Sequence, residues 1–243
     1  MAALARLAAA PRRLARAGRA LLSPALEFLL PQRCPGCGEP ALPERVLCER
    51  CVARIPRLST PLCARCLAAG RPPEGCVRHA GFRVFAPWQY DDHAGAVVHA
   101  LKYGSRPALA AALGGVLAGA VPPAWRAADL VLEVPLHPAR ERERGYNQAA
   151  LLADALAESL AAPRMNGSLA RVRATRPQAR LGERARRANV AGAFRARLAP
   201  RLRGRRVLIV DDVMTTGATL EACLEALADA GARAAGVALA WTP

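Results

Sequence analysis

Two adjacent acids and a run of hydroxyl residues are the feature of this sequence that best indicates its chemistry. Asp211 and Asp212 follow the aliphatic run 207–210, and three threonines lie among the next seven residues. Carboxylates accept hydrogen bonds from vicinal hydroxyls or hold a divalent cation. Threonine hydroxyls and unpaired N–H groups at a helix start bind phosphate. Together these residues predict a site for a sugar phosphate of the ribose 5-phosphate kind.

The flanking residues predict the elements that carry this site. The β-branched run 207–210 is typical of a buried parallel strand, and the pattern from Ala218 to Ala230 predicts a helix that Gly231 ends. In open α/β sheets, ligands bind at the carboxyl ends of strands. The alternative is an ordinary strand followed by a charged loop and a threonine N-cap. The predicted ligand-binding residues are Asp211, Asp212, Met214, Thr215, Thr216, Gly217, Ala218 and Thr219.

Seven of the eight cysteines lie between Cys34 and Cys76, spaced as CxxC pairs, and Cys76 forms a fourth pair with His79. Two residues between ligands allow both side chains to point into one tetrahedral zinc site. Gly36 and Gly38 suit the tight turn of the first pair. Sequential pairing predicts one site of Cys34, Cys37, Cys48 and Cys51, and a second of Cys63, Cys66, Cys76 and His79.

Other uses of these cysteines are disulfides, a redox dithiol, or a single zinc site with the remaining pairs degraded. Repeated CxxC pairs completed by a histidine favour metal over disulfides. A site with four protein ligands has no open position, so we expect structural zinc, one or two ions, and no zinc catalysis. Reduced cysteines also favour a cytoplasmic location.

The rest of the chain alternates between strand-like and helix-like segments. We expect an edge strand or hairpin at 81–90, strands at 130–136 and 234–241, a helix over 94–117 broken near 104–107, and a helix over 148–160 capped by Asn147. Residues 169–194 show no sustained periodicity. This order predicts an α/β fold with a mostly parallel sheet and helices on both faces, preceded by a small zinc-ribbon domain.

The net charge of +16 is concentrated in one segment. From Arg164 to Arg206 there are 14 arginines against one acid, Glu183, which gives +13. Such a segment predicts contact with a polyanion, and the alternative is a solvated basic loop in an arginine-biased protein. The candidates for polyanion or DNA contact are Arg171, Arg173, Gln178, Arg184 and Arg187.

The first 33 residues contain six arginines and one acid, Glu27. Their alanine- and leucine-rich pattern is compatible with a transit peptide, but we interpret 1–33 as an amphipathic helical segment that packs on the protein. No apolar run approaches the roughly 18–20 residues that span a bilayer. We therefore expect no stable membrane insertion.

The run 207–219 resembles the phosphoribosyl pyrophosphate signature of type I phosphoribosyltransferases. The cysteine pairs resemble one branch, the ComF (competence) family, as do residues 101–104, 134–137, 144–148 and 192–194 and a spaced polar set between 171 and 189. The resemblance covers roughly residues 26–243. It implies a double zinc ribbon at 34–80 and a phosphoribosyltransferase-like domain at 81–243. In the ComF pattern the last pair is usually two cysteines, so His79 is a departure.

The resemblance also implies partners and roles. Phosphoribosyl pyrophosphate would bind with Mg²⁺, and residues 169–194 would form a loop or hairpin that closes over it. The family role is DNA uptake in natural transformation, with single-stranded DNA and a competence helicase as partners. The pyrophosphate would contact Lys102, Arg140, Arg144 and Gly145.

The sequence does not decide whether the protein is an enzyme. Some nucleobase-salvage relatives have an acid at the position of Thr215, and its absence leaves no named base catalyst. Two alternatives to the ComF role therefore stay open. One is a phosphoribosyltransferase of nucleobase salvage, and the other is a non-catalytic adaptor whose loops are ordered by the ligand.

Overall fold

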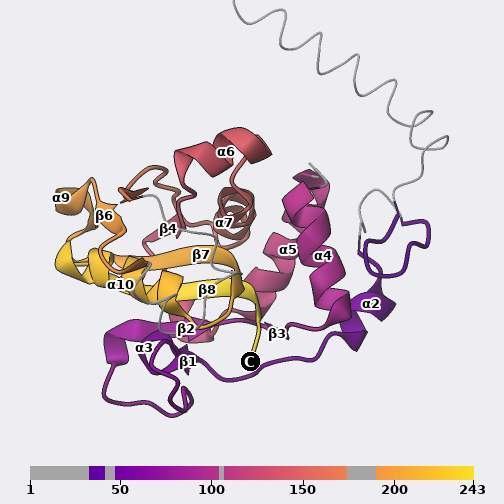
Figure 1. Cartoon of the computed structure of the whole chain (residues 1–243), viewed down its shortest axis with the longest axis horizontal. Coiled ribbons are helices and arrows are strands. Elements are labelled where there is room, and N and C mark those ends of the chain that lie inside the picture. Colours follow the sequence, from indigo (N-terminus) through magenta and orange to yellow (C-terminus); the bar gives the residue numbers. More distant parts are fainter. Residues whose placement is uncertain (1–32, 42–46, 104–106, 174–189) are drawn as a thin grey trace, which may run out of the picture.

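The central sheet has six strands, in the order β1-β2-β8-β7-β4, with β3 also pairing with β8. The computed structural model describes residues 33–41, 47–103, 107–173 and 190–243. β1 is antiparallel to β2 and every other pairing is parallel, which confirms the predicted mostly parallel α/β fold (Figure 1). The strands are β1 (Leu62–Cys63), β2 (Arg83–Phe85), β3 (Trp88–Gln89), β4 (Leu130–Glu133), β7 (Arg206–Met214) and β8 (Arg233–Trp241).

Both faces of the sheet are covered. Leu208 and Val210 of β7 point into a core formed with α4 (Asp92–Tyr103), α5 (Pro107–Ala120) and α7 (Gln148–Ser159). Val207 and Ile209 point into a second core formed with α10 (Ala218–Asp229) and with the hairpin of β5 (Leu169–Arg171) and β6 (Phe194–Ala196). Because side chains alternate along a strand, an unbroken aliphatic run fills both cores. Shorter helices are α6 (Pro138–Arg144), α9 (Ala199–Leu202), η1 (Ala80–Phe82) and η2 (Pro123–Trp125).

β7 is longer than the sequence predicted. It continues through both acids to Met214, because β8 pairs with it as far as Trp241. The acids are therefore part of the strand, and the turn before α10 is shorter than expected. The helix predicted over 218–230 is confirmed as α10, which is followed by Gly231 with a positive φ of 78°.

The segment 81–90 is neither an edge strand nor a hairpin. η1 precedes β2, and then β2 and β3 pair in parallel with successive parts of β8. Pro87 lies between them and has no N–H to donate, which accounts for the interruption. On its other side this segment is flanked by β1 and by residues 56–58, so it lies inside the sheet.

The predicted loop after β4 contains a short helix, α6. The His137 side chain caps it by accepting from the Ala139 N–H at 3.3 Å, and Gly145 ends it with a φ of 82°. The other two helix predictions are confirmed: α4 ends and α5 begins on either side of 104–106, and the Asn147 side chain caps α7. Residues 1–32, and so nearly all of the predicted amphipathic segment, lie outside the described residues.

The two cysteine-rich segments pack on opposite faces of the sheet. α2 (Glu49–Arg54) follows Cys48, and Cys51 and Ile55 join the core of α4 and α5. α3 (Ala64–Leu67) packs in the other core, against α10. Figure 1 shows α2 beside α4 and, at the other end, α3 and β1 below α10. The division at residue 80 stays a prediction, and β1 belongs to the central sheet.

Candidate functional site

The turn between β7 and α10 has the features of a phosphate-binding loop. Gly217 is the N-cap residue of α10, with a φ of 72° and no side-chain capping bond, and the N–H groups at a helix start point toward an anion bound before the helix. Within the described residues, the buried hydroxyl oxygen of Thr216 has no hydrogen-bond partner. A small pocket lies here, lined by Asp211, Val213, Met214, Thr215, Gly217, Ala218, Thr219 and Leu220.

Asp211 is the acid that lines this pocket. Burial disfavours its charge and the neighbouring Asp212 repels it, so the pKa of Asp211 is raised to about 8. Its Oδ1 accepts a hydrogen bond from the Asp212 N–H at 2.8 Å, and it interacts electrostatically with Arg171. A buried carboxyl with this pKa is poorly compensated by the protein alone. Sugar hydroxyls or a cation would supply the missing interactions.

Asp212 has different partners. Its Oδ2 accepts from Gln148 Nε2 at 2.9 Å and pairs with Lys102 Nζ at 3.2 Å, and its Oδ1 accepts from the Val213 N–H at 2.7 Å. These partners lie on the α4 and α7 side of the sheet, since adjacent strand residues point to opposite faces. Lys102, predicted to contact pyrophosphate, is thus paired with Asp212 here.

The segment 144–148 holds four elements together. Arg144 Nη1 donates to Gln148 Oε1 at 2.6 Å, and Gln148 in turn donates to Asp212. The Tyr146 hydroxyl donates to the Leu101 carbonyl at 2.6 Å. Asn147 Nδ2 donates to the Val134 carbonyl at 3.0 Å, while its Oδ1 caps α7. The motif therefore ties α4, β4, α7 and β7 around the acids. Sequence reasoning did not assign Tyr146 or Gln148 to the site, although both belong to the quoted motif.

Two of the predicted basic contacts lie among the described residues, and Arg171 is the one near the pocket. Arg171 is partly buried, with its guanidinium 5.5 Å from the Phe194 ring, and burial and the charge of Arg140 lower the pKa of Arg171. Arg171 was predicted as a polyanion contact on the basic segment, and in the structure it lies within electrostatic range of Asp211. Arg173 is exposed and donates to the Ala191 carbonyl across the hairpin at 2.8 Å. Gln178, Arg184 and Arg187 lie outside the described residues.

Other arginines of the basic segment have structural partners. Arg164 pairs with Glu133 at 2.9 Å and with Asp154 at 2.7 Å. Arg206 pairs with Asp129 at 2.8 Å at the amino edge of the sheet. A cavity of about 450 Å³ opens at that edge, but it is far from the carboxyl ends of the strands, so we assign the ligand site to the smaller pocket at Asp211.

An exposed aromatic residue lies beside these basic groups. The Tyr103 ring is 65% exposed and lies 4.7 Å from the His99 ring and 5.5 Å from the Arg144 guanidinium. It belongs to the segment 101–104 that resembles the ComF family, but the sequence analysis assigned it no role. A ring in this position offers a flat face to a base or a second substrate beside the residues predicted to contact pyrophosphate.

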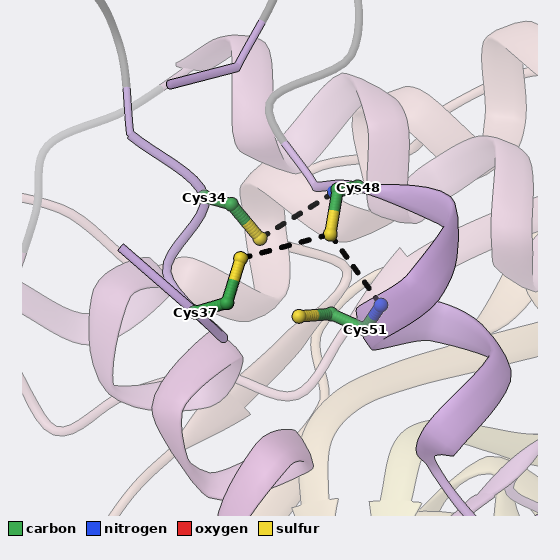
Figure 2. A group of neighbouring side chains, drawn as sticks. All are labelled: Cys34, Cys37, Cys48 and Cys51. Atoms are coloured by element: carbon green, nitrogen blue, oxygen red, sulfur yellow. Dashed lines mark hydrogen bonds between the residues drawn. The ribbon is translucent and has the colours of Figure 1, made fainter. Parts of the chain in front are cut away.

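The first metal site has the geometry that zinc requires. The four sulfurs of Cys34, Cys37, Cys48 and Cys51 lie within 4.8 Å of one another (Figure 2). The Cys37 and Cys48 sulfurs are 3.8 Å apart, close to the separation of about 3.8 Å that Zn–S bonds of about 2.3 Å give in a tetrahedron. Gly36 is required here, since a Cβ would lie 2.8 Å from the Cys51 sulfur. Burial disfavours the Cys34 thiolate, but N–H groups donated to its sulfur lower the pKa of Cys34 to about 7.

The second metal site is formed by Cys63, Cys66, Cys76 and His79, again within 4.8 Å of one another. His79 Nδ1 lies 3.5–3.6 Å from each of the three sulfurs, and the Cys66 and Cys76 sulfurs are 3.6 Å apart. The imidazole therefore occupies the fourth corner of a tetrahedron. The donor sets suit structural zinc in both sites. Cys223 is a buried residue of α10 and belongs to the second core.

Comparison with known proteins agrees with this architecture. Residues 111–243 match the phosphoribosyl transferase domain family, and residues 25–78 match the double zinc ribbon domain family. The chain is thus a phosphoribosyltransferase-type domain joined to a double zinc ribbon. It is 36% identical over 217 residues to the DNA utilization protein YhgH of Salmonella typhi, covering 84% of this chain and 93% of that protein. The chain belongs to the ComF family.

Two further similarities are more limited. The chain is 41% identical over 93 residues to Competence protein F of Haemophilus influenzae, which covers 38% of this chain and 41% of that protein. A solved structure of glutamine phosphoribosylpyrophosphate amidotransferase from B. subtilis, complexed with ADP and GMP, overlaps with a TM-score of 0.37 at 25% identity. That overlap covers 58% of this chain and 30% of the amidotransferase chain. In the described part of this chain, no helix is long and apolar enough to cross a membrane.

Proposed function

We propose that the protein binds phosphoribosyl pyrophosphate at the pocket between Asp211 and α10. The observation that carries the proposal is the buried, unpartnered Thr216 hydroxyl in a loop that opens at a helix N-terminus beside a buried carboxyl. The 5-phosphate would take N–H groups and hydroxyls from Thr215 to Thr219. Asp211 would accept from the ribose hydroxyls, and Asp212 would hold Gln148 and Lys102 in place.

The pyrophosphate would lie toward α4 and α6. Arg144 is held by Gln148, and Arg140 lies near Arg171, so these guanidinium groups can bind phosphate oxygens in bidentate fashion. Lys102, which Asp212 holds in place, adds a third cation. Gly145, at the end of α6, allows close backbone approach. Mg²⁺ bound with the ligand would neutralise phosphate charge, and Asp211 is the carboxyl suited to hold it.

The role we infer is DNA uptake and natural transformation. The names of the relatives, DNA utilization protein and Competence protein F, support it. The basic hairpin that starts at Arg171 and Arg173 would contact single-stranded DNA, and a competence helicase would be a partner in the cytoplasm. Stacking of a base on Tyr103 next to the pyrophosphate residues fits both a DNA strand and a free nucleobase.

Catalysis would require an acceptor. If pentosyl transfer occurs, Arg144 and its neighbours would stabilise the departing pyrophosphate while Asp211 fixes the ribose. Thr215 offers no carboxylate to deprotonate a base. The alternatives remain a nucleobase-salvage transferase, which would release pyrophosphate with a nucleobase, and an adaptor that binds the ligand without turnover.

Isothermal titration with phosphoribosyl pyrophosphate and Mg²⁺ tests the site. We expect Asp211→Asn and Thr216→Val to weaken binding at least tenfold, because Asp211 lines the pocket and Thr216 carries a buried hydroxyl in the same loop that has no partner among the described residues. Asp154→Asn is the control, since this exposed acid on α7 pairs with Arg164. Undetectable binding to the unsubstituted protein would overturn the proposal, as would equal affinity of all three variants.

A further inference from the structure

The second metal site touches the phosphate loop. α3 begins directly after the ligand Cys63 and includes the ligand Cys66. A Cβ at Gly217 would lie 3.2 Å from the Ala64 carbonyl oxygen and 3.2 Å from the Leu67 Cβ. The backbone of the loop therefore packs against α3 with no room for a side chain. Ala64 and Leu67 lie in the same core as Met214 and Ala218, on either side of the loop.

An ion pair joins the same two elements. Arg65, between the ligands Cys63 and Cys66, places Nε 3.3 Å from Glu221 and Nη2 3.0 Å from Glu225, both on α10. The Glu221 side chain is 7% exposed, and its N–H donates to the Gly217 carbonyl at 2.8 Å. A buried negative charge in the first turn of α10 opposes an anionic ligand at that helix N-terminus. Arg65 offsets this charge.

The last ligand of the metal site also supports Arg65. The Phe82 N–H donates to the His79 carbonyl at 3.0 Å, and the Arg65 guanidinium packs on the Phe82 ring, 3.7 Å from its centre. The four ligands thus fix both α3 below the loop and the aromatic face on which Arg65 lies. A metal ion is what holds so short a segment in one conformation.

We propose that the second metal site positions the phosphate loop, so that affinity for phosphoribosyl pyrophosphate depends on zinc at Cys63, Cys66, Cys76 and His79 and on Arg65. The inference rests on the proposed function. Among the described residues, the first metal site packs in the core on the opposite face of the sheet, away from the loop. Because coupling between two bound ligands is reciprocal, phosphoribosyl pyrophosphate must also strengthen zinc retention at the second site.

Titration of the zinc-loaded full chain with phosphoribosyl pyrophosphate separates positioning from general stability. We expect Arg65→Met to weaken binding about fivefold or more. Adding Glu221→Gln to that variant restores most of the affinity, because no buried charge then needs an arginine. Arg206→Met is the matched control, since it breaks an ion pair at the far edge of the sheet, and its affinity stays that of the unsubstituted protein.

Zinc release to a chromogenic chelator gives a second readout. With both sites loaded, phosphoribosyl pyrophosphate slows release of one zinc ion. Cys76→Ala abolishes that slow phase and weakens ligand binding, whereas Cys37→Ala, in the first site, keeps both. If Cys76→Ala does not fold, the Arg65→Met variant and its combination with Glu221→Gln still test the proposal, since both retain all eight metal ligands.

Failures of the two proposals are distinguishable. An unsubstituted protein that does not bind phosphoribosyl pyrophosphate contradicts the proposed function. An unsubstituted protein that binds it, while Arg65→Met binds equally well and zinc release ignores the ligand, overturns the positioning role alone.

Discussion

At the residue scale, the two adjacent acids of β7 differ because of what surrounds them. Asp212 is compensated by Lys102, Gln148 and the Val213 N–H. Asp211 is partly buried beside that charged neighbour, and its Oδ1 accepts a hydrogen bond from the Asp212 N–H. Two acids that are equivalent in the sequence are therefore suited to different tasks. One anchors basic and amide side chains, and the other remains for a ligand.

The raised pKa of Asp211 predicts a pH dependence of stability. Between about pH 4 and its folded pKa of about 8, the folded protein retains a proton that the unfolded chain has released. The contribution of Asp211 to the free energy of unfolding is therefore fully present below about pH 4 and is lost as the pH rises to about 8. We expect Asp211→Asn to remove this change in the free energy of unfolding with pH.

Urea unfolding at pH 5 and at pH 8, with and without the substitution, measures this effect. We expect the stability difference between the two pH values to shrink by about 1 kcal/mol or more in Asp211→Asn. An unchanged difference would show that another group titrates in this range.

At the element scale, α10 and the turn before it combine two constraints. Gly217 has a left-handed backbone conformation and also lies against α3. The helix is anchored at its other end by Gly231, whose carbonyl accepts from the Gly204 N–H at 2.8 Å. The position of the phosphate loop therefore depends on contacts at both ends of α10.

Replacing Gly217 with alanine tests these constraints. A positive φ costs alanine about 1–2 kcal/mol, and the contact with Ala64 adds to it. Gly204→Ala is the control, because its φ of 75° carries the same strain while no atom lies within 4 Å of the added methyl. We expect Gly217→Ala to lower the free energy of unfolding further than Gly204→Ala in chemical denaturation, and only Gly217→Ala to weaken ligand binding. Equal losses in both variants would contradict the packing argument.

At the scale of the whole molecule, the metal-binding segments support both faces of one sheet. The first site contributes Cys34 and Cys51 to the core of α4 and α5, and the second contributes α3 to the core of α10. β1, which contains the zinc ligand Cys63, pairs with β2 and so belongs to the central sheet. The zinc sites and the phosphoribosyltransferase-type domain therefore share their apolar cores.

Zinc removal is expected to destabilise the whole molecule. Chelation should lower the Tm of the main unfolding transition, and the fluorescence of Trp88, which is buried in the first core, should change at the same temperature. Calorimetry with and without chelator measures this. A separate early transition that leaves the main Tm in place would indicate an independently folded ribbon.

The proposed DNA contact predicts a salt dependence. Neutralising Arg173, Arg184 and Arg187 with glutamine should weaken single-stranded DNA binding and reduce the slope of log K against log salt by about 2, at about 0.7 per phosphate contact. The same change at the exposed Arg50, Arg54 and Arg57 on and after α2 is the matched control. Fluorescence anisotropy across a salt series gives the slope, and equal slopes for the two triple variants would contradict a DNA contact by the basic segment 164–206.

The sequence by itself determined what depends on local pattern. The aliphatic run before Asp211, the cap at Asn147 and the CxxC spacing each act within a few residues, so they predicted the strand, the helix start and the ligand sets. The resemblance of residues 207–219 to a known signature predicted the loop.

Tertiary structure alone decided how these parts meet. Lys102 pairs with Asp212 across 110 positions of sequence, Arg65 reaches Glu221 across 156, and the two cysteine segments lie on opposite faces of the sheet. Such contacts depend on strand order and on the direction of each side chain, which no local spacing encodes. The same cause placed Asp211 in the pocket and turned Asp212 away from it.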